Sequence, residues 1–297
     1  MSARQILAVV NPRSGSRRSA RIVRQLQRLL QPAGFDVTIA TTSHPGHAAQ
    51  IAATADLQPL HCLAVVGGDG TIHEIVNGLL QRDQPVTTPL AIVPAGTGNA
   101  IALQYQLSSV RDAARCILQG IPAPLDMVKV QLADRLTYCV NIVGWGAATD
   151  INITAEKLRW LGRSRYSIAA LLQILSPAVR TARITLDDQT LEEPFLFAVL
   201  CNTRYAGHRM LLTPAAQSDD GLLDVLLLRP GSRRNLLRVF QGVADGTHLQ
   251  LPNVEYRQVR SLKIHTAQPC PLNLDGELSG QTPFTATVLP GALRVLS

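Results

Sequence analysis

The chain has 297 residues, of which 46% are hydrophobic and 16% are charged. This composition excludes a mainly disordered protein, because it supplies enough apolar surface to offset the entropy lost on folding. The formal net charge of +7 suits phosphate groups, anionic lipids or nucleic acid, but an aromatic content of 4% argues against surfaces on which bases stack. We therefore expect no nucleic-acid partner. The length suggests two domains.

The sequence predicts neither a membrane span nor a secretion signal. The longest uncharged stretch, residues 84–110, is interrupted by prolines and glycines, whereas a spanning helix needs about 20 mostly apolar residues. The N-terminus enters an apolar strand without the apolar segment and cleavage site of a signal peptide. Five cysteines without a Cys-x-x-Cys pair favour reduced thiols over disulfides or zinc. We therefore expect a cytoplasmic protein.

The first part of the chain alternates apolar runs with helical patterns. Alternation of this kind is typical of a parallel sheet with helices on both faces. The predicted strands are residues 6–10, 36–40, 62–66 and 90–93, and the predicted helices are residues 17–30, 46–55 and a segment ending at residue 80.

The pattern changes near residues 122–124, beyond which short strand-like runs are separated by turn residues. One strong helix is predicted in this part, at residues 167–175. We therefore expect an α/β domain at residues 1–124 and a mainly antiparallel β domain at residues 125–289. The predicted strands of the second domain are residues 127–132, 137–143, 182–186, 195–201, 222–228, 261–266 and 285–289.

Polar and glycine-rich loops follow the strands of the first domain. They lie at residues 11–15, 67–71 and 96–99, and Thr42 follows a further strand. Because the carboxyl ends of parallel strands meet at one sheet edge, we expect these loops to converge there. Glycine loops and helix N-termini suit phosphate groups, whereas Asp69 beside a polyanion would need a bridging Mg²⁺. The alternative is a set of tight turns with Asp69 as a helix cap. Neither the P-loop nor the dinucleotide-binding pattern is present.

Four motifs occur in a family-specific order. They are Asn-Pro-x-Ser-Gly at 11–15, Gly-Gly-Asp-Gly-Thr-x-x-Glu-x-x-Asn-Gly at 67–78, Gly-Thr-Gly-Asn at 96–99 and Asp-Gly-Glu at 275–277. Over essentially its whole length the chain resembles the diacylglycerol kinase catalytic-domain family, which includes bacterial lipid kinases, sphingosine kinases and ceramide kinases. The resemblance implies an ATP-binding α/β domain similar to phosphofructokinase and NAD kinase. It also implies a β-sandwich carrying the lipid pocket and a final strand, residues 290–297, that can return to the first domain.

The resemblance also implies roles for individual residues. In the family an acidic Asp-Gly-Glu loop faces the nucleotide across the interdomain cleft, which makes Glu277 the first candidate for the proton acceptor and Asp275 the second. Asp69 would help to hold a catalytic Mg²⁺. ATP would bind through Asn11, Pro12, Arg13, Ser14, Gly15, Thr42, Gly67, Gly68, Asp69, Gly70, Thr71, Ile72, His73 and Thr97.

Two further stretches match the family. Residues 217–222 resemble a loop that binds a structural Mg²⁺, in which Asp220 would give a carboxylate, and Gln217 and Leu222 would give backbone carbonyls. Residues 144–166 resemble the sphingosine kinases, in which an aspartate at the position of Asn152 pairs with the lipid's ammonium group. Asp150 lies beside it on the expected substrate side. Because asparagine cannot form that charge pair, we expect a neutral lipid alcohol such as diacylglycerol to be favoured.

The function implied by the resemblance is an ATP-dependent lipid kinase that binds transiently to a membrane surface. Arginines at 17–28 and 159–165 could attract anionic headgroups, although the first group is more typical of a solvated helix face. The alternatives are a sphingoid-base kinase, an NAD kinase and a catalytically silent regulator that binds lipid or nucleotide. A homodimer is left open.

Overall fold

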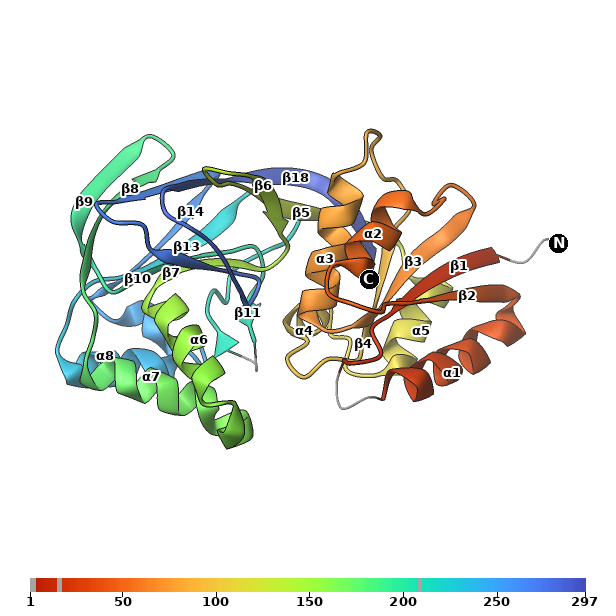
Figure 1. Ribbon diagram of the computed structural model, residues 1–297, viewed down its shortest axis with the longest axis horizontal. Coiled ribbons are helices and arrows are strands. Elements are labelled where there is room, and N and C mark those ends of the chain that lie inside the picture. Colours follow the sequence, from red (N-terminus) through yellow and green to blue (C-terminus); the bar gives the residue numbers. More distant parts are fainter. Residues whose placement is uncertain (1–3, 15–17, 208–209) are drawn as a thin grey trace. The chain divides into compact units, whose positions relative to one another are not determined.

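The computed structural model describes residues 4–14, 18–207 and 210–297, without the side chains of Arg159, Arg163 and Tyr166 (Figure 1). It divides into two compact units. Unit 1 comprises Met1–Met127, Ser218–Asp220 and Leu289–Ser297, and unit 2 comprises Val128–Gln217 and Gly221–Val288. Two strands, β5 (Pro122–Gln131) and β18 (Phe284–Leu296), contain residues of both units.

Unit 1 is built on a parallel sheet whose strands run in the order β2-β1-β3-β4, with the end of β18 parallel to β4. The central strands are buried on both faces, which explains their continuous apolar sequences. Helices α1 and α5 pack on one face, and α2 and α3 cover the other (Figure 1). The elements are β1 (Arg4–Val10), α1 (Ser19–Leu30), β2 (Phe35–Thr41), α2 (His47–Thr54), β3 (Leu60–Gly67), α3 (Asp69–Leu80), β4 (Leu90–Pro94), α4 (Ala100–Gln104) and α5 (Val110–Gln119).

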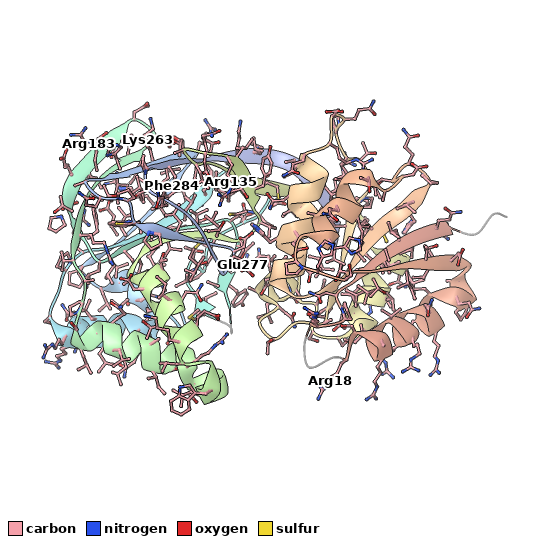
Figure 2. The ribbon with its side chains drawn as sticks, in the orientation of Figure 1. Arg18, Arg135, Arg183, Lys263, Glu277 and Phe284 are labelled. Carbon is pink, nitrogen blue, oxygen red and sulfur yellow. The ribbon has the colours of Figure 1, made fainter. Side chains whose placement is uncertain are left out.

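Unit 2 is a sandwich of antiparallel strands around an apolar core that contains Trp145 and Phe195. On β15 Leu262 and Ile264 point into this core, and Lys263 lies on the outer face (Figure 2). One layer contains β6 (Leu136–Cys139), β8 (Arg180–Leu186), β9 (Gln189–Phe195) and β15 (Ser261–Thr266), with parts of β5 and β18. The other contains β7 (Ile142–Gly146), β10 (Phe197–Cys201), β13 (Leu223–Leu228), β14 (Val254–Val259), β16 (Pro271–Leu274) and β17 (Glu277–Gln281). In addition, β11 (Tyr205–Ala206) pairs antiparallel with β12 (Met210–Leu211).

The fold class is therefore confirmed, and the details of unit 2 differ from the prediction. Besides α7 (Arg165–Leu175), unit 2 contains α6 (Ala147–Lys157) and α8 (Arg233–Gly242), so the prediction of a single helix was wrong. Helix α6 is rich in Thr, Asn and Asp, which have low helix propensity. Helix α8 buries little besides Leu236 and Val239, so its apolar periodicity is weak. No helix in the described part of the chain is long and apolar enough to cross a membrane.

Candidate functional site

The predicted loops of unit 1 meet at the carboxyl edge of its sheet. Each loop begins with a backbone hydrogen bond to the neighbouring strand. The Asn11 N–H donates to the Val66 carbonyl at 3.1 Å, and the Ala95 N–H donates to the Gly67 carbonyl at 2.9 Å. The Thr42 N–H donates to the Val10 carbonyl at 2.9 Å. These bonds place the three loops and Thr42 side by side.

The loops after β3 and β4 touch through two glycines. A Cβ atom added to Gly96 would lie 2.4 Å from the Gly68 Cα, so no other residue fits at this contact. The Asn99 side chain holds the second loop, because its Oδ1 accepts from the Gly96 N–H and its Nδ2 donates to the Gly96 carbonyl, both at 2.9 Å. The first turns of α3 and α4 therefore begin next to a surface of bare backbone, which suits the close approach of a phosphate.

Asp69 connects these two loops. It is the first residue of α3, yet its carboxylate oxygens accept from the Ala100 and Ile101 N–H groups of α4 at 3.1 and 3.2 Å. A carboxylate at a helix N-terminus is stabilised by the unpaired N–H groups and the helix dipole. Asp69 is thus a cap, as one interpretation of the sequence held, but it caps the helix of the neighbouring loop.

Asn11 links the first loop to the second. Its Nδ2 donates to the Thr71 hydroxyl at 3.1 Å, and its Oδ1 accepts from the Arg13 N–H at 2.9 Å. Ile72 is only 2% exposed, so its side chain belongs to the core and only its backbone could contact a nucleotide. Of the other residues expected to bind ATP, Thr42 and Gly67 are buried, Ser14, Gly68, Gly70 and His73 are half-buried, Pro12 and Thr97 are exposed, and Gly15 lies outside the described residues.

The second half of the long glycine motif packs helices together. The Glu74 carboxylate accepts from the Ala48 N–H at 3.1 Å, which caps α2. A Cβ atom at Gly78 would lie 2.1 Å from the Ala49 carbonyl oxygen, so α2 and α3 approach closely at this point. Residues 74–78 therefore support the loop at 67–71 by fixing the helix that follows it.

In unit 2, Asp275 and Gly276 form the turn between β16 and β17. Their φ angles of 51° and 96°, and the pairing of Leu274 with Glu277, define a two-residue hairpin of type I′. The Asp275 carboxylate is buried and accepts three backbone N–H groups, from Val140 at 2.9 Å, Asn141 at 2.8 Å and Ile142 at 2.9 Å. The sequence alone indicated a surface turn, but its first side chain points inward.

Two asparagines hold the peptide groups on either side of Gly276. The Gly276 N–H donates to Asn273 Oδ1, and Asn152 Nδ2 donates to the Gly276 carbonyl, both at 2.8 Å. Asn152 comes from α6 and is 5% exposed. Glu277, the exposed first residue of β17, follows directly (Figure 2). The backbone that carries Glu277 is therefore held by the side chains of Asp275, Asn273 and Asn152.

The other predicted substrate residue, Asp150, forms an ion pair. Both of its carboxylate oxygens accept from the Arg180 guanidinium, at 2.8 and 3.0 Å, so the pair ties α6 to β8. The sequence analysis missed Arg180, Asn273 and the supporting role of Asn152. Asn273 carried a usable signal, because asparagine side chains often bond the backbone of a nearby turn and Asn273 lies two residues before Asp275.

The loop expected to bind a structural Mg²⁺ is anchored in unit 1 by Ser218. Its carbonyl accepts from the Asp126 N–H at 2.7 Å, and its hydroxyl lies 3.0 Å from the Tyr105 hydroxyl. Burial raises the pKa of Tyr105 to about 12, so this hydroxyl stays protonated at neutral pH. Gln217 and Asp220 are exposed, and Leu222 is half-buried. The metal at this loop stays a prediction.

Family models match both parts of the chain. The diacylglycerol kinase catalytic domain matches residues 5–130, and the YegS C-terminal NAD kinase beta sandwich-like domain matches residues 141–297. The chain belongs to the diacylglycerol kinase catalytic-domain family. Its members are lipid kinases that use ATP, and the resemblance inferred from the four motifs is confirmed.

Named relatives include both kinds of lipid kinase. A diacylglycerol kinase of Bacillus subtilis is 26% identical over 93% of this chain and 90% of its own length, and one of Mycobacterium tuberculosis is 28% identical over 98% and 94%. Sphingosine kinase 1 of Arabidopsis thaliana is 26% identical over 88% of this chain, which spans 64% of that protein. The crystal structure of a Bacillus anthracis diacylglycerol kinase has the same fold, with a TM-score of 0.74, 21% identity and coverage of 100% and 97%.

Proposed function

We propose that the chain is an ATP-dependent kinase that phosphorylates the hydroxyl group of a neutral lipid alcohol, such as diacylglycerol, at a membrane surface. The observation that carries this proposal is the pair of glycine loops joined by Asp69 at the sheet edge, in a chain of this family. The exposed Glu277 on its fixed hairpin supports it from unit 2.

Unit 1 has the groups that the phosphates of ATP require. The contact between Gly68 and Gly96 removes side chains from the loop surface, and α3 begins there. Mg²⁺ would neutralise phosphate charge when bound, and Asp69 is the carboxylate that would help to hold it. The two N–H groups of α4 already fix the orientation of this carboxylate, so it fits an electrostatic and positioning role.

Glu277 is the proposed acceptor of the lipid's proton. In the reaction the lipid hydroxyl oxygen forms a bond to the γ-phosphorus, the bond from that phosphorus to the bridging oxygen breaks, and ADP leaves with the electron pair. The hydroxyl proton passes to the Glu277 carboxylate. Asp275 suits this role less well, because its buried carboxylate already accepts from the backbone N–H groups of Val140, Asn141 and Ile142.

The contacts of Asn152 lead to a sharper prediction for this residue. An aspartate there would set a carboxylate against the Gly276 carbonyl and remove the donor that the carbonyl now has. We expect Asn152→Asp to lower kcat about tenfold or more with both diacylglycerol and sphingosine, because a turn that loses this bond displaces Glu277 and small displacements of a catalytic group strongly lower the rate. Steady-state kinetics with each lipid measure the effect.

The ratio of kcat/KM for sphingosine to kcat/KM for diacylglycerol separates a role of Asn152 in holding the turn from direct recognition of the lipid. If Asn152 faced the lipid, Asn152→Asp would raise relative kcat/KM for sphingosine by about tenfold, the value of one lost charge pair. If it holds the turn, the ratio stays constant and Asn152→Leu, which lacks both the donor and the charge, shows a smaller loss of kcat.

Asp150 is proposed to anchor α6 through Arg180.

A structural Mg²⁺ at residues 217–222 predicts an effect of chelation. Metal that binds only the folded state stabilises it by mass action. We therefore expect EDTA to lower the thermal unfolding midpoint of the wild type and to leave Asp220→Ala unchanged, since that variant has lost the one carboxylate of the site. Differential scanning calorimetry tests this. Equal midpoints for both proteins with and without EDTA would show that the loop holds no metal.

Incubation of the protein with γ-labelled ATP, Mg²⁺, NAD and a total lipid extract tests the proposed function. Label in a lipid supports it, and the chromatographic mobility of the product identifies the lipid. Label in a dinucleotide would instead identify an NAD kinase. Absence of label in both fractions, with ATP binding intact, would indicate a silent regulator.

A further inference from the structure

Helix α7 exposes an apolar stripe. Ile168, Leu171, Leu172 and Leu175 follow the spacing that aligns side chains along one side of a helix. Such a stripe normally packs in a core, but these side chains are 37%, 47%, 49% and 53% exposed. The stripe is therefore a surface without a cover among the described residues.

Helix α8 extends this surface. It lies beside α7 on the same side of unit 2 (Figure 1), and Leu237 and Phe240 are exposed on it while Leu236 and Val239 pack inward. We call the exposed residues of the two helices the α7–α8 face. Its apolar members are Ile168, Leu171, Leu172, Leu175, Leu237 and Phe240.

The charged side chains on α7 and α8 are all basic, and Arg165 at the start of α7 pairs with Glu156 of α6. Arg233, Arg234 and Arg238 are exposed on α8, and none of them forms an ion pair within the described parts of the chain. The sequence contains no Asp or Glu at residues 157–186 or 229–244, the segments that contain the two helices. The face thus combines exposed apolar side chains with three arginines of α8 that form no ion pair among the described residues.

We propose that the α7–α8 face docks onto an anionic lipid bilayer. Apolar side chains on a helix can enter the boundary between headgroups and acyl chains, and flanking arginines attract the anionic headgroups. A second copy of the chain is a poorer partner, because two such faces would bring like charges together. The proposal rests on the proposed function only in that a lipid substrate calls for a bilayer as the partner.

Helix α1 provides the internal comparison. Its arginines at 21, 24 and 28 are exposed, as is Arg18 before it (Figure 2), but Val23, Leu26 and Leu30 are buried beneath the sheet. It offers charge without apolar groups, so it is a solvated helix face. The membrane contact expected from arginine clusters is therefore assigned to unit 2.

Vesicle sedimentation without ATP tests the docking. The vesicles contain phosphatidylcholine alone or phosphatidylcholine with phosphatidylglycerol. The variants are Leu172→Glu with Leu175→Glu, and Arg234→Glu with Arg238→Glu, and the matched control is Arg24→Glu with Arg28→Glu on α1. We expect the wild type to prefer the anionic vesicles, both α7–α8 variants to bind them at least tenfold more weakly, and the control to stay within about twofold of the wild type.

The following results would overturn the proposal: α7–α8 variants that bind like the wild type, a control that loses as much binding, or a wild-type dimer on size exclusion that Leu172→Glu with Leu175→Glu dissociates. Phosphorylation of a short-chain, water-soluble diacylglycerol should be equal in all variants, which shows that they are folded. Intact vesicle binding by a wild type that phosphorylates no lipid would refute the proposed function and leave the docking face standing.

Discussion

Replacing Glu277 with glutamine should lower kcat for lipid phosphorylation by about 10²–10⁴-fold, the usual loss when a general base is removed. Glutamine keeps the size and polarity of the side chain but cannot take up the hydroxyl proton. Because Glu277 is exposed at the start of β17, the hairpin should keep its conformation. ATP affinity, measured by calorimetry, and the thermal unfolding midpoint should therefore match the wild type.

Asp188→Asn is the matched control for this experiment. Asp188 is an exposed carboxylate in the turn between β8 and β9, and it also belongs to unit 2. Its replacement removes the same charge and should leave kcat unchanged. A normal kcat for Glu277→Gln would remove this residue from the mechanism, and an equal loss in both variants would point to a general effect of charge.

Replacing Asp275 with alanine should destabilise the protein strongly. The change removes the acceptor of three backbone N–H groups at a buried position, and each buried donor left without a partner costs about 1–3 kcal/mol. It also places alanine at a φ of 51°, which aspartate tolerates better. We expect the thermal unfolding midpoint to fall by roughly 5–10 °C.

Asp275→Asn separates the structural role from a chemical one. Asparagine tolerates the turn conformation and keeps one acceptor oxygen, so its midpoint should lie between those of alanine and the wild type. If the loss of kcat follows the loss of stability across these variants, Asp275 supports Glu277. A large loss of kcat in Asp275→Asn with an unchanged midpoint would identify Asp275 as the proton acceptor instead.

Sequence patterns predicted the strands best where burial alone decides the pattern of apolar residues. The apolar runs of unit 1 are strands buried on both faces, and the strand predicted at residues 261–266 coincides with β15, whose side chains alternate. In contrast, residues 137–143 were predicted as one strand and form β6 and β7. The break falls at Val140 and Asn141, whose N–H groups bond the Asp275 carboxylate. That bond joins residues about 135 positions apart, so no local pattern reveals it.

The same limit applies to the candidate site. Glycine and acidic residues in the loops were visible as motifs, because their chemistry is carried by the residue type. The groups that orient these residues come from distant segments of the chain. The α4 backbone bonds Asp69, Asn152 bonds the Gly276 carbonyl, and Arg180 pairs with Asp150. The resemblance gives the position of Asn152 in the chain and not its hydrogen bond to Gly276, so its role in lipid recognition stays a prediction beside the role in the turn.

The path of β18 has a consequence for how the protein folds. Residues Leu289–Ser297 belong to unit 1, where Val295 pairs with Leu90. The side chains of Leu293, Val295 and Leu296 are almost fully buried there. During synthesis, therefore, the sheet of unit 1 cannot be completed until almost all of unit 2 has been made. Contacts between residues so far apart in the chain close late, because the entropy of the intervening loop is lost before they form. Until then the apolar edge of β4 stays open, and chaperones have a surface to protect.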